Sequence, residues 1–171
     1  VLVVPFGILL FNYGTEPEAR ALAAFIFVIA SLTDYADGAL ARKQGLVTTF
    51  GKIADPLADK ALTGVALIGL SYLGELPWWV TIVILAREIA VTLLRFWVIR
   101  HGVIAASRGG KAKTATLIVA ILMYLLPLTG FLLTAREWVM GLAVILAVVT
   151  GVDYLVRALK LRATTSGNSA S

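Results

Sequence analysis

The chain has 171 residues, of which 60% are hydrophobic and only 15% are charged, and its mean hydropathy is +0.92. No ordinary soluble domain has this composition, so we expect an all-α integral membrane protein. The lack of cysteine excludes disulfide and thiol chemistry. The formal net charge of +5 is explained by membrane topology and attraction to anionic lipid headgroups, and we expect no nucleic-acid partner.

Apolar runs bounded by charges, proline and glycine predict a bundle of six transmembrane helices with short loops. We expect one domain over residues 1–163 and a disordered, polar tail over 164–171. The first run is shorter than the roughly 20 residues that span a bilayer, and the chain begins with Val1, so we expect that an upstream part of this helix is missing. The six runs cover residues 1–12, 19–32, 56–73, 78–99, 114–134 and 138–155.

Basic residues predict the orientation of this bundle, because Lys and Arg are retained on the cytoplasmic side of a membrane. One side holds only Arg20 and Arg136, together with Trp78 and Trp138 at the interface. We therefore expect a multi-pass protein of the cell membrane whose other side is cytoplasmic. That side holds Arg42, Lys43, Lys52, Lys60, Arg100, Arg108, Lys111, Lys113, Arg157, Lys160 and Arg162.

Four of the ten acidic residues fall between positions 34 and 59, beside two apolar runs on the predicted cytoplasmic side. Carboxylates beside hydrocarbon are costly and are rarely kept without a function. Asp34 and Asp37 are three residues apart, and Asp55 and Asp59 are four apart, so each pair shares a helix face. We expect the segment 38–51 to turn the chain around, so that the four carboxylates converge.

Converging carboxylates repel one another unless a cation binds them, and hard divalent ions such as Mg²⁺ prefer oxygen ligands. The sequence therefore predicts a metal site of Mg²⁺ or Mn²⁺, with two ions, at Asp34, Asp37, Asp55 and Asp59. The alternative is that these aspartates only cap helices or pair with Arg42 and Lys60.

The full pattern is Asp34-x-x-Asp37-Gly38-x-x-Ala41-Arg42, eight residues, then Gly51-x-x-x-Asp55-x-x-x-Asp59. It resembles the signature of the CDP-alcohol phosphotransferase family, and every fixed position is filled. The resemblance implies a metal-dependent membrane enzyme, typically a homodimer, that moves a phosphatidyl-type group from a CDP-linked donor to an alcohol and releases CMP.

By the same resemblance, the first three aspartates are metal ligands, and Asp59 is the catalytic base that also lies at the metal site. The guanidinium of Arg42 suits a phosphate, although this side chain could instead brace the carboxylates. The positions that accommodate the cytidine nucleotide are Thr33, Gly38, Ala41, Arg42 and Gly51.

Residues outside the signature resemble the phosphatidylglycerophosphate synthase branch of the family, which uses CDP-diacylglycerol as donor and sn-glycerol 3-phosphate as acceptor. The stretches that carry this resemblance are 31–38, 55–60, 86–88 and 107–114. Cations and glycine N–H groups in a loop at 107–113 suit an acceptor phosphate. We expect this phosphate to bind Arg95, Ser107, Arg108, Lys111 and Lys113.

Some of these assignments have competing interpretations. Arg95 could pair with Glu88 instead of a phosphate, and Arg87 is better explained by a structural pair with the neighbourhood of Glu88 or with Asp153. Alternative acceptors within the family are inositol phosphate, serine and phosphatidylglycerol. Outside it, a divalent-cation transporter would also place carboxylates in a bundle, but near mid-membrane. Intramembrane aspartyl proteolysis is the weakest alternative, because it needs two aspartates and not this frame.

Overall fold

The computed structural model describes the backbone of residues 2–44, 51–98 and 108–168. It describes the side chains of these ranges apart from 34–44, 51–59, 95, 96, 98, 108 and 161–168. Every regular element in the described part of the chain is an α-helix, which confirms the all-α fold class. The helices are α1 (Val3–Tyr13), α2 (Pro17–Gln44), α3 (Gly51–Tyr72), α4 (Trp78–Val98), α5 (Arg108–Leu125) and α6 (Phe131–Asn168).

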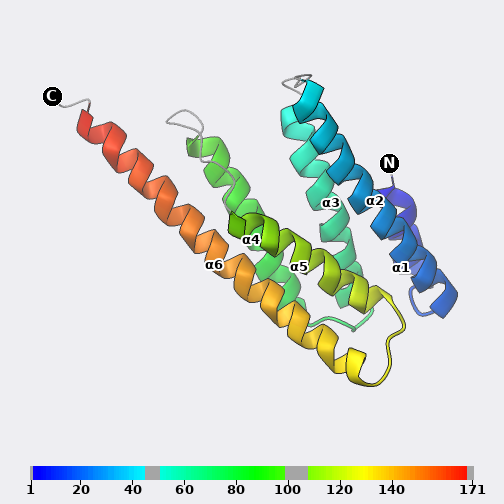
Figure 1. Cartoon of the computed structure of the whole chain (residues 1–171). Helices are drawn as coiled ribbons and strands as arrows, with labels where there is room; N and C mark the ends of the chain where they lie inside the picture. Colours follow the sequence, from blue (N-terminus) through cyan, green and yellow to red (C-terminus); the bar gives the residue numbers. More distant parts are fainter. Residues whose placement is uncertain (1, 45–50, 99–107, 169–171) are drawn as a thin grey trace.

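The helices run up and down beside one another, so that one end of the bundle gathers the end of α2 and the start of α3 (Figure 1). The long helix α6 packs against α4 and α5, whereas α1 packs against α2 and α3 on the other side (Figure 1). The helices α2, α3 and α5 also contact one another. The two helices that carry the aspartates, α2 and α3, are therefore packed against each other and against α1 and α5.

The core between these helices is apolar and contains many small residues. Phe6 of α1 packs against Phe27 of α2 with ring centroids 5.6 Å apart. Helices in lipid associate through van der Waals packing and not through the hydrophobic effect, and small side chains allow their backbones to approach closely. The small buried residues include Ala23, Ala24, Ala66, Ala120, Ala143 and Ala147.

The outer surface carries many exposed apolar side chains. They occur on all six helices, with Val4, Phe25, Ile68, Ile89, Val119 and Ile145 as examples. One stretch within the described residues, Phe131–Lys160 of α6, is both long and apolar enough to cross a membrane, and only 17% of its apolar window is buried. Contiguous exposed apolar surface of this kind needs a partner or a lipid environment.

Helix ends differ from the apolar runs in an informative way. The helix α2 continues twelve residues past the predicted end at 32 and reaches Gln44, because Ala, Leu, Arg, Lys and Gln are all strong helix formers. The apolar run marks how far hydrocarbon could cover the helix, not where the helix ends. The expected turn over 38–51 is therefore wrong in extent, since Gly38 lies within α2 and Gly51 begins α3.

The last two predicted runs also have wrong boundaries. The run 114–134 is split, because α5 ends at Leu125 just before Pro127, which lacks an N–H donor, and Gly130 follows with a φ of 60°. The helix α6 starts at Phe131 and continues to Asn168, into the segment 164–171 for which the composition predicts disorder. The first run is confirmed as short, with α1 comprising 11 residues.

Candidate active site

The four aspartates lie on two helices that contact each other. Asp34 and Asp37 are in the last part of α2, and Asp55 and Asp59 are in the first turns of α3. The two helix ends adjoin the same connection at 45–50, so both aspartate pairs belong to the same end of the bundle (Figure 1). Because both segments are helical, spacings of three and four residues put each pair on one helix face, as predicted.

The chemistry of this set of donors fits a hard divalent ion, because four carboxylates supply oxygen ligands only. Their side chains lie outside the described part of the chain. Among the side chains that are described, no group of three His, Cys, Asp or Glu residues could hold a metal. The aspartate segment therefore remains the candidate metal site on the strength of helix placement and ligand type.

The residues predicted to bind the nucleotide lie on the same two helix ends. Thr33 is exposed on α2, and its hydroxyl donates to the carbonyl oxygen of Ile29 over 2.8 Å. Gly38, Ala41 and Arg42 follow on the same helix, and Gly51 is the first residue of α3. Only Thr33 among these five has a described side chain.

The predicted phosphate-binding loop at 107–113 is corrected in part. Residues Arg108 to Lys113 form the first turns of α5, so the glycines at 109 and 110 are helical. A helix start still offers backbone N–H groups, because the first four have no partner within the helix. Lys111 is exposed there, whereas Ser107 and the side chains of Arg108 and Arg95 lie outside what the structure describes.

Lys113 differs from Lys111, because it is buried and its ammonium group binds the Glu88 carboxylate of α4. Only 6% of Lys113 is exposed. An ammonium group has three donors, so a phosphate could bind it only by sharing it with Glu88. The structure thus separates two lysines for which the sequence predicts the same role.

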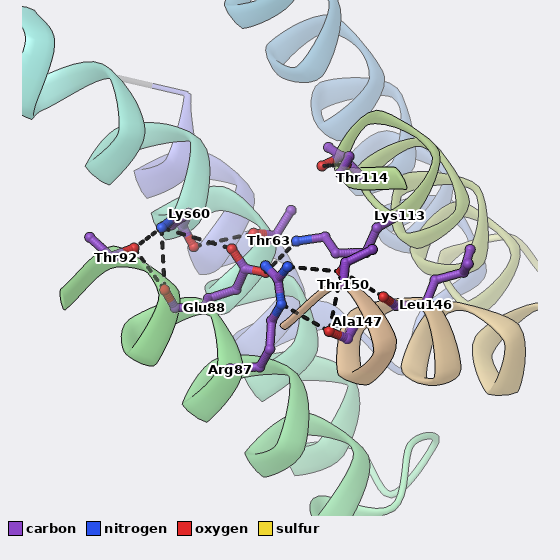
Figure 2. A network of polar contacts seen from close by, with 11 residues as sticks. Lys60, Thr63, Arg87, Glu88, Thr92, Lys113, Thr114, Leu146, Ala147 and Thr150 are labelled. Atoms are coloured by element: carbon purple, nitrogen blue, oxygen red, sulfur yellow. Dashed lines mark hydrogen bonds and ion pairs between the residues drawn. The ribbon is translucent and has the colours of Figure 1, made fainter. Parts of the chain in front are cut away.

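Glu88 accepts contacts from two further cations. The guanidinium Nη1 of Arg87 lies 2.9 Å from Glu88 Oε1, and Lys60 Nζ of α3 lies 3.8 Å from Oε2 (Figure 2). Lys60 also donates to the Thr92 hydroxyl and, over 3.4 Å, to the Glu88 carbonyl. We call Lys60, Arg87, Glu88, Thr92, Lys113 and Thr150, which accepts a hydrogen bond from Arg87, the Glu88 cluster.

Arg87 extends this cluster to α6. Its Nε donates to the Ala147 carbonyl and its Nη2 to the Thr150 hydroxyl, both over 2.9 Å (Figure 2). Gly151 makes room for it, since a Cβ there would lie 3.1 Å from Arg87 Cγ. The predicted structural role of Arg87 agrees with its pair to Glu88, but Asp153 pairs with Arg157 instead, over 3.0 Å.

The central position of Glu88 is what sequence reasoning missed. The sequence suggests Glu88 as a possible partner of Arg95 and its neighbourhood as a partner of Arg87, and Lys60 as a possible partner of the aspartates, but it does not place Glu88 among three cations. The sequence does contain a signal for this cluster, because Arg87 and Glu88 lie next to each other inside an apolar run. Charged residues in such runs usually pair with one another or line a substrate pathway. Which lysines complete the pair depends on packing.

A second cluster of charges lies at the end of the bundle opposite to the aspartates. Glu75, in the connection between α3 and α4, pairs with Arg20 over 2.7 Å and with Arg136 over 3.0 Å. Arg20 also donates to the Tyr124 carbonyl over 2.6 Å, and the Arg136 guanidinium lies 4.5 Å from the Tyr124 ring centroid. We call Arg20, Glu75, Tyr124 and Arg136 the Glu75 cluster.

The two arginines of this cluster affect the titration of Glu75. Burial acts to raise the pKa of Glu75, but hydrogen bonds and charge attraction from Arg20 and Arg136 outweigh it. The pKa of Glu75 therefore lies below its ordinary value of 4.5. The carboxylate is charged at neutral pH and ties α2 and α6 to the connection between α3 and α4.

Comparison with known proteins agrees with the motif. The sequence profile of the CDP-alcohol phosphatidyltransferase family matches residues 1–149. The chain is similar to a probable phosphatidylglycerophosphate synthase of Mycobacterium tuberculosis, at 53% identity over 94% of this chain and 78% of the relative. It is also similar to a CDP-diacylglycerol–glycerol-3-phosphate 3-phosphatidyltransferase of Bacillus subtilis, at 41% identity over 90% of this chain and 83% of the relative.

A third relative, the enzyme of the same name from Rickettsia typhi, is 38% identical over 90% of this chain and 89% of its own length. The match of the profile covers most of the chain and includes both aspartate pairs. The chain belongs to the CDP-alcohol phosphatidyltransferase family.

Proposed function

We propose that this protein transfers the phosphatidyl group of CDP-diacylglycerol to sn-glycerol 3-phosphate, forming phosphatidylglycerophosphate and CMP in phospholipid biosynthesis. The observation that carries the proposal is the complete aspartate signature on two contacting helices, in a chain whose relatives are named for this reaction. The acceptor hydroxyl oxygen attacks the phosphorus that bears diacylglycerol, and the bond from that phosphorus to the CMP oxygen breaks.

Asp59 is the base in this proposal, taking the proton from the attacking hydroxyl. Asp34, Asp37, Asp55 and Asp59 hold Mg²⁺ or Mn²⁺, with room for two ions by ligand number. When bound, such ions neutralise the pyrophosphate and make CMP a better leaving group. The positions of these residues on adjoining helix ends are consistent with one shared centre.

The nucleotide binds beside this centre, on α2 and the start of α3. Gly38, Ala41 and Gly51 leave space for its close approach, Arg42 contacts a phosphate, and Thr33 lies at the edge of the site. Thr33 is an exposed residue of α2, the helix that carries the first half of the signature, and this exposure supports its place beside the nucleotide.

The acceptor phosphate binds near the first turns of α5. Its ligands are Arg95, Ser107, Arg108 and Lys111, with Lys113 behind them adding positive charge while bound to Glu88. The exposure of Lys111 at a helix start supports this arrangement, because such a start favours an anion.

We further propose that the helices form a multi-pass bundle in the cell membrane, with the aspartates facing the cytoplasm, and that two copies form a homodimer. The long apolar stretch of α6 and the exposed apolar side chains on the outer faces support a lipid environment. The excess of basic residues beside the aspartates supports the cytoplasmic orientation.

The decisive test is CMP release and lipid product formation by the protein in nanodiscs with CDP-diacylglycerol and Mg²⁺ or Mn²⁺. Glycerol 3-phosphate, inositol 1-phosphate, serine and phosphatidylglycerol are offered separately. We expect turnover with glycerol 3-phosphate alone, and its loss with EDTA. Turnover with another acceptor would replace the acceptor but keep the reaction class, whereas metal flux into liposomes without CMP release would favour the transporter.

A further inference from the structure

The Glu88 carboxylate is a shared partner of cations from three helices. Lys60 comes from α3, Arg87 from α4 itself and Lys113 from α5 (Figure 2). Glu88 lies near the middle of α4, about 15 Å along the helix axis from either end at 1.5 Å per residue. A partly buried charge at this depth is costly, so its presence points to a structural or chemical role.

The charges of this cluster depend on Glu88. These four side chains carry three positive charges and one negative charge, and each cation contacts the same carboxylate. Without the negative charge, the cations would repel one another in a medium of low dielectric constant. Glu88 therefore holds Lys60 and Lys113 at positions that neither would keep against the other two cations.

Both lysines lie next to residues of the proposed reaction. Lys60 directly follows Asp59, the proposed base, and shares its helix. Lys113 lies two residues after Lys111, in the α5 segment proposed to bind the acceptor phosphate. One carboxylate thus connects the α3 turn that receives the hydroxyl proton with the α5 turn that holds the other end of the same acceptor.

We propose that Glu88 is a positioning residue for the acceptor, which sets the separation between Asp59 on α3 and the phosphate-binding turn of α5. This inference rests on the function proposed above. Glu88 acts through Lys60 and Lys113 and does not itself contact substrate. A displacement of about 1 Å between two ends of a substrate site can lower the rate by about a hundredfold, so the loss of this link affects the acceptor step specifically.

The test compares Glu88→Gln with Glu75→Gln in nanodiscs, because both remove one carboxylate charge flanked by cations without changing side-chain size. Steady-state kinetics give the KM for glycerol 3-phosphate, the KM for CDP-diacylglycerol and kcat, and thermal unfolding gives the folded fraction. We expect Glu88→Gln to lower kcat/KM for glycerol 3-phosphate by roughly 10-fold to 100-fold, with less than about a twofold change in the donor KM.

Glu75→Gln should leave both KM values unchanged, and kcat unchanged once corrected for the folded fraction. Glu88→Asp, which keeps the charge, should recover part of the kcat/KM for glycerol 3-phosphate that Glu88→Gln loses. Equal effects of Glu88→Gln on both substrates, or equal effects of the two Gln variants, would overturn the positioning role. If Glu88→Gln does not fold, Lys60→Met decides, because it removes the ion pair between Glu88 and α3 and leaves Glu88 bound to Lys113: an unchanged acceptor KM would then overturn the role.

Wild-type turnover distinguishes this inference from the function on which it rests. A wild-type protein that uses a different acceptor overturns the proposed acceptor, and Glu88→Gln must then impair that acceptor selectively for the positioning role to stand. A wild-type protein that uses glycerol 3-phosphate while Glu88→Gln is normal overturns only the positioning role.

Discussion

The Glu88 cluster and the Glu75 cluster are built from the same kinds of side chain, but they lie at different levels of the helix bundle. Glu88 is in mid-helix, whereas Glu75 lies in a connection where α2 and α6 begin and α5 ends. The Glu88 side chain is 15% exposed and that of Glu75 is 26% exposed. Helix ends surround Glu75, whereas Glu88 lies ten residues from either end of its own helix.

This difference in position indicates that the two clusters have different functions. A carboxylate between arginines at the end of a bundle, here called the rim, can hold loops and helix ends together at a modest desolvation cost, since part of the charge remains hydrated. A carboxylate in mid-bundle costs more, and its cations lead to α3 and α5, which carry the proposed base and acceptor turn. We therefore expect substitutions at the rim to change stability, and substitutions toward the aspartates to change catalysis.

The largest expected effect is at Asp59, beyond the Glu88 cluster on α3. Asp59→Asn should abolish turnover, by at least the roughly 10²- to 10⁴-fold that a general base contributes, while CDP-diacylglycerol binding stays measurable. CMP release and donor binding are measured together. The matched control is Asp153→Asn, which removes a carboxylate from an exposed ion pair on α6. Normal turnover of the Asp59 variant would exclude it as the base.

A smaller effect is expected at Lys111, which sharpens the contrast with buried Lys113. Lys111→Ala should raise the KM for glycerol 3-phosphate by about tenfold and change the donor KM little, because an exposed ammonium group binds a phosphate without supporting the bundle. Initial rates over both substrate concentrations check this. Arg157→Ala removes an exposed cation from α6 and serves as the control. Parallel changes in both KM values would indicate a structural role.

Removing the rim carboxylate should affect stability and not chemistry. Glu75→Gln leaves Arg20 and Arg136 without their charged partner, which we expect to cost about 1–2 kcal/mol of unfolding free energy and to lower Tm by roughly 2–8 °C. Thermal unfolding in detergent measures the shift, with turnover corrected for the folded fraction. A loss of acceptor affinity in this variant would remove the distinction between the two clusters.

The smallest expected effect is the pH dependence of the same cluster. Because the pKa of Glu75 is below 4.5 in the folded protein and near 4.5 when unfolded, its contribution to stability is complete above that value. The contribution is lost as the pH falls through the folded-state pKa. The difference in Tm between wild type and Glu75→Gln should therefore narrow from about pH 7 to about pH 3. A difference that stays constant would show that charge is not its cause.

Helix boundaries show which features of the fold could be predicted. Hydropathy located all six helices in order, but it placed the end of α2 at 32 when the helix reaches Gln44. The reason is that hydropathy reports the solvent along a helix, and backbone hydrogen bonding continues through polar residues. Hydropathy predicts one helix over 114–134 despite Pro127, because apolar residues on both sides of the proline hide the break.

By itself, the sequence determined the all-α class, the family and the aspartate signature, because fixed spacings of Asp, Gly and Arg are read directly along one chain. Only the tertiary structure decided the partners of the buried charges. Lys60, Glu88 and Lys113 are far apart in the sequence, and helix packing brings them together. The sequence gives the depth of a charge in an apolar run, but the identity of its partner depends on which helix faces it.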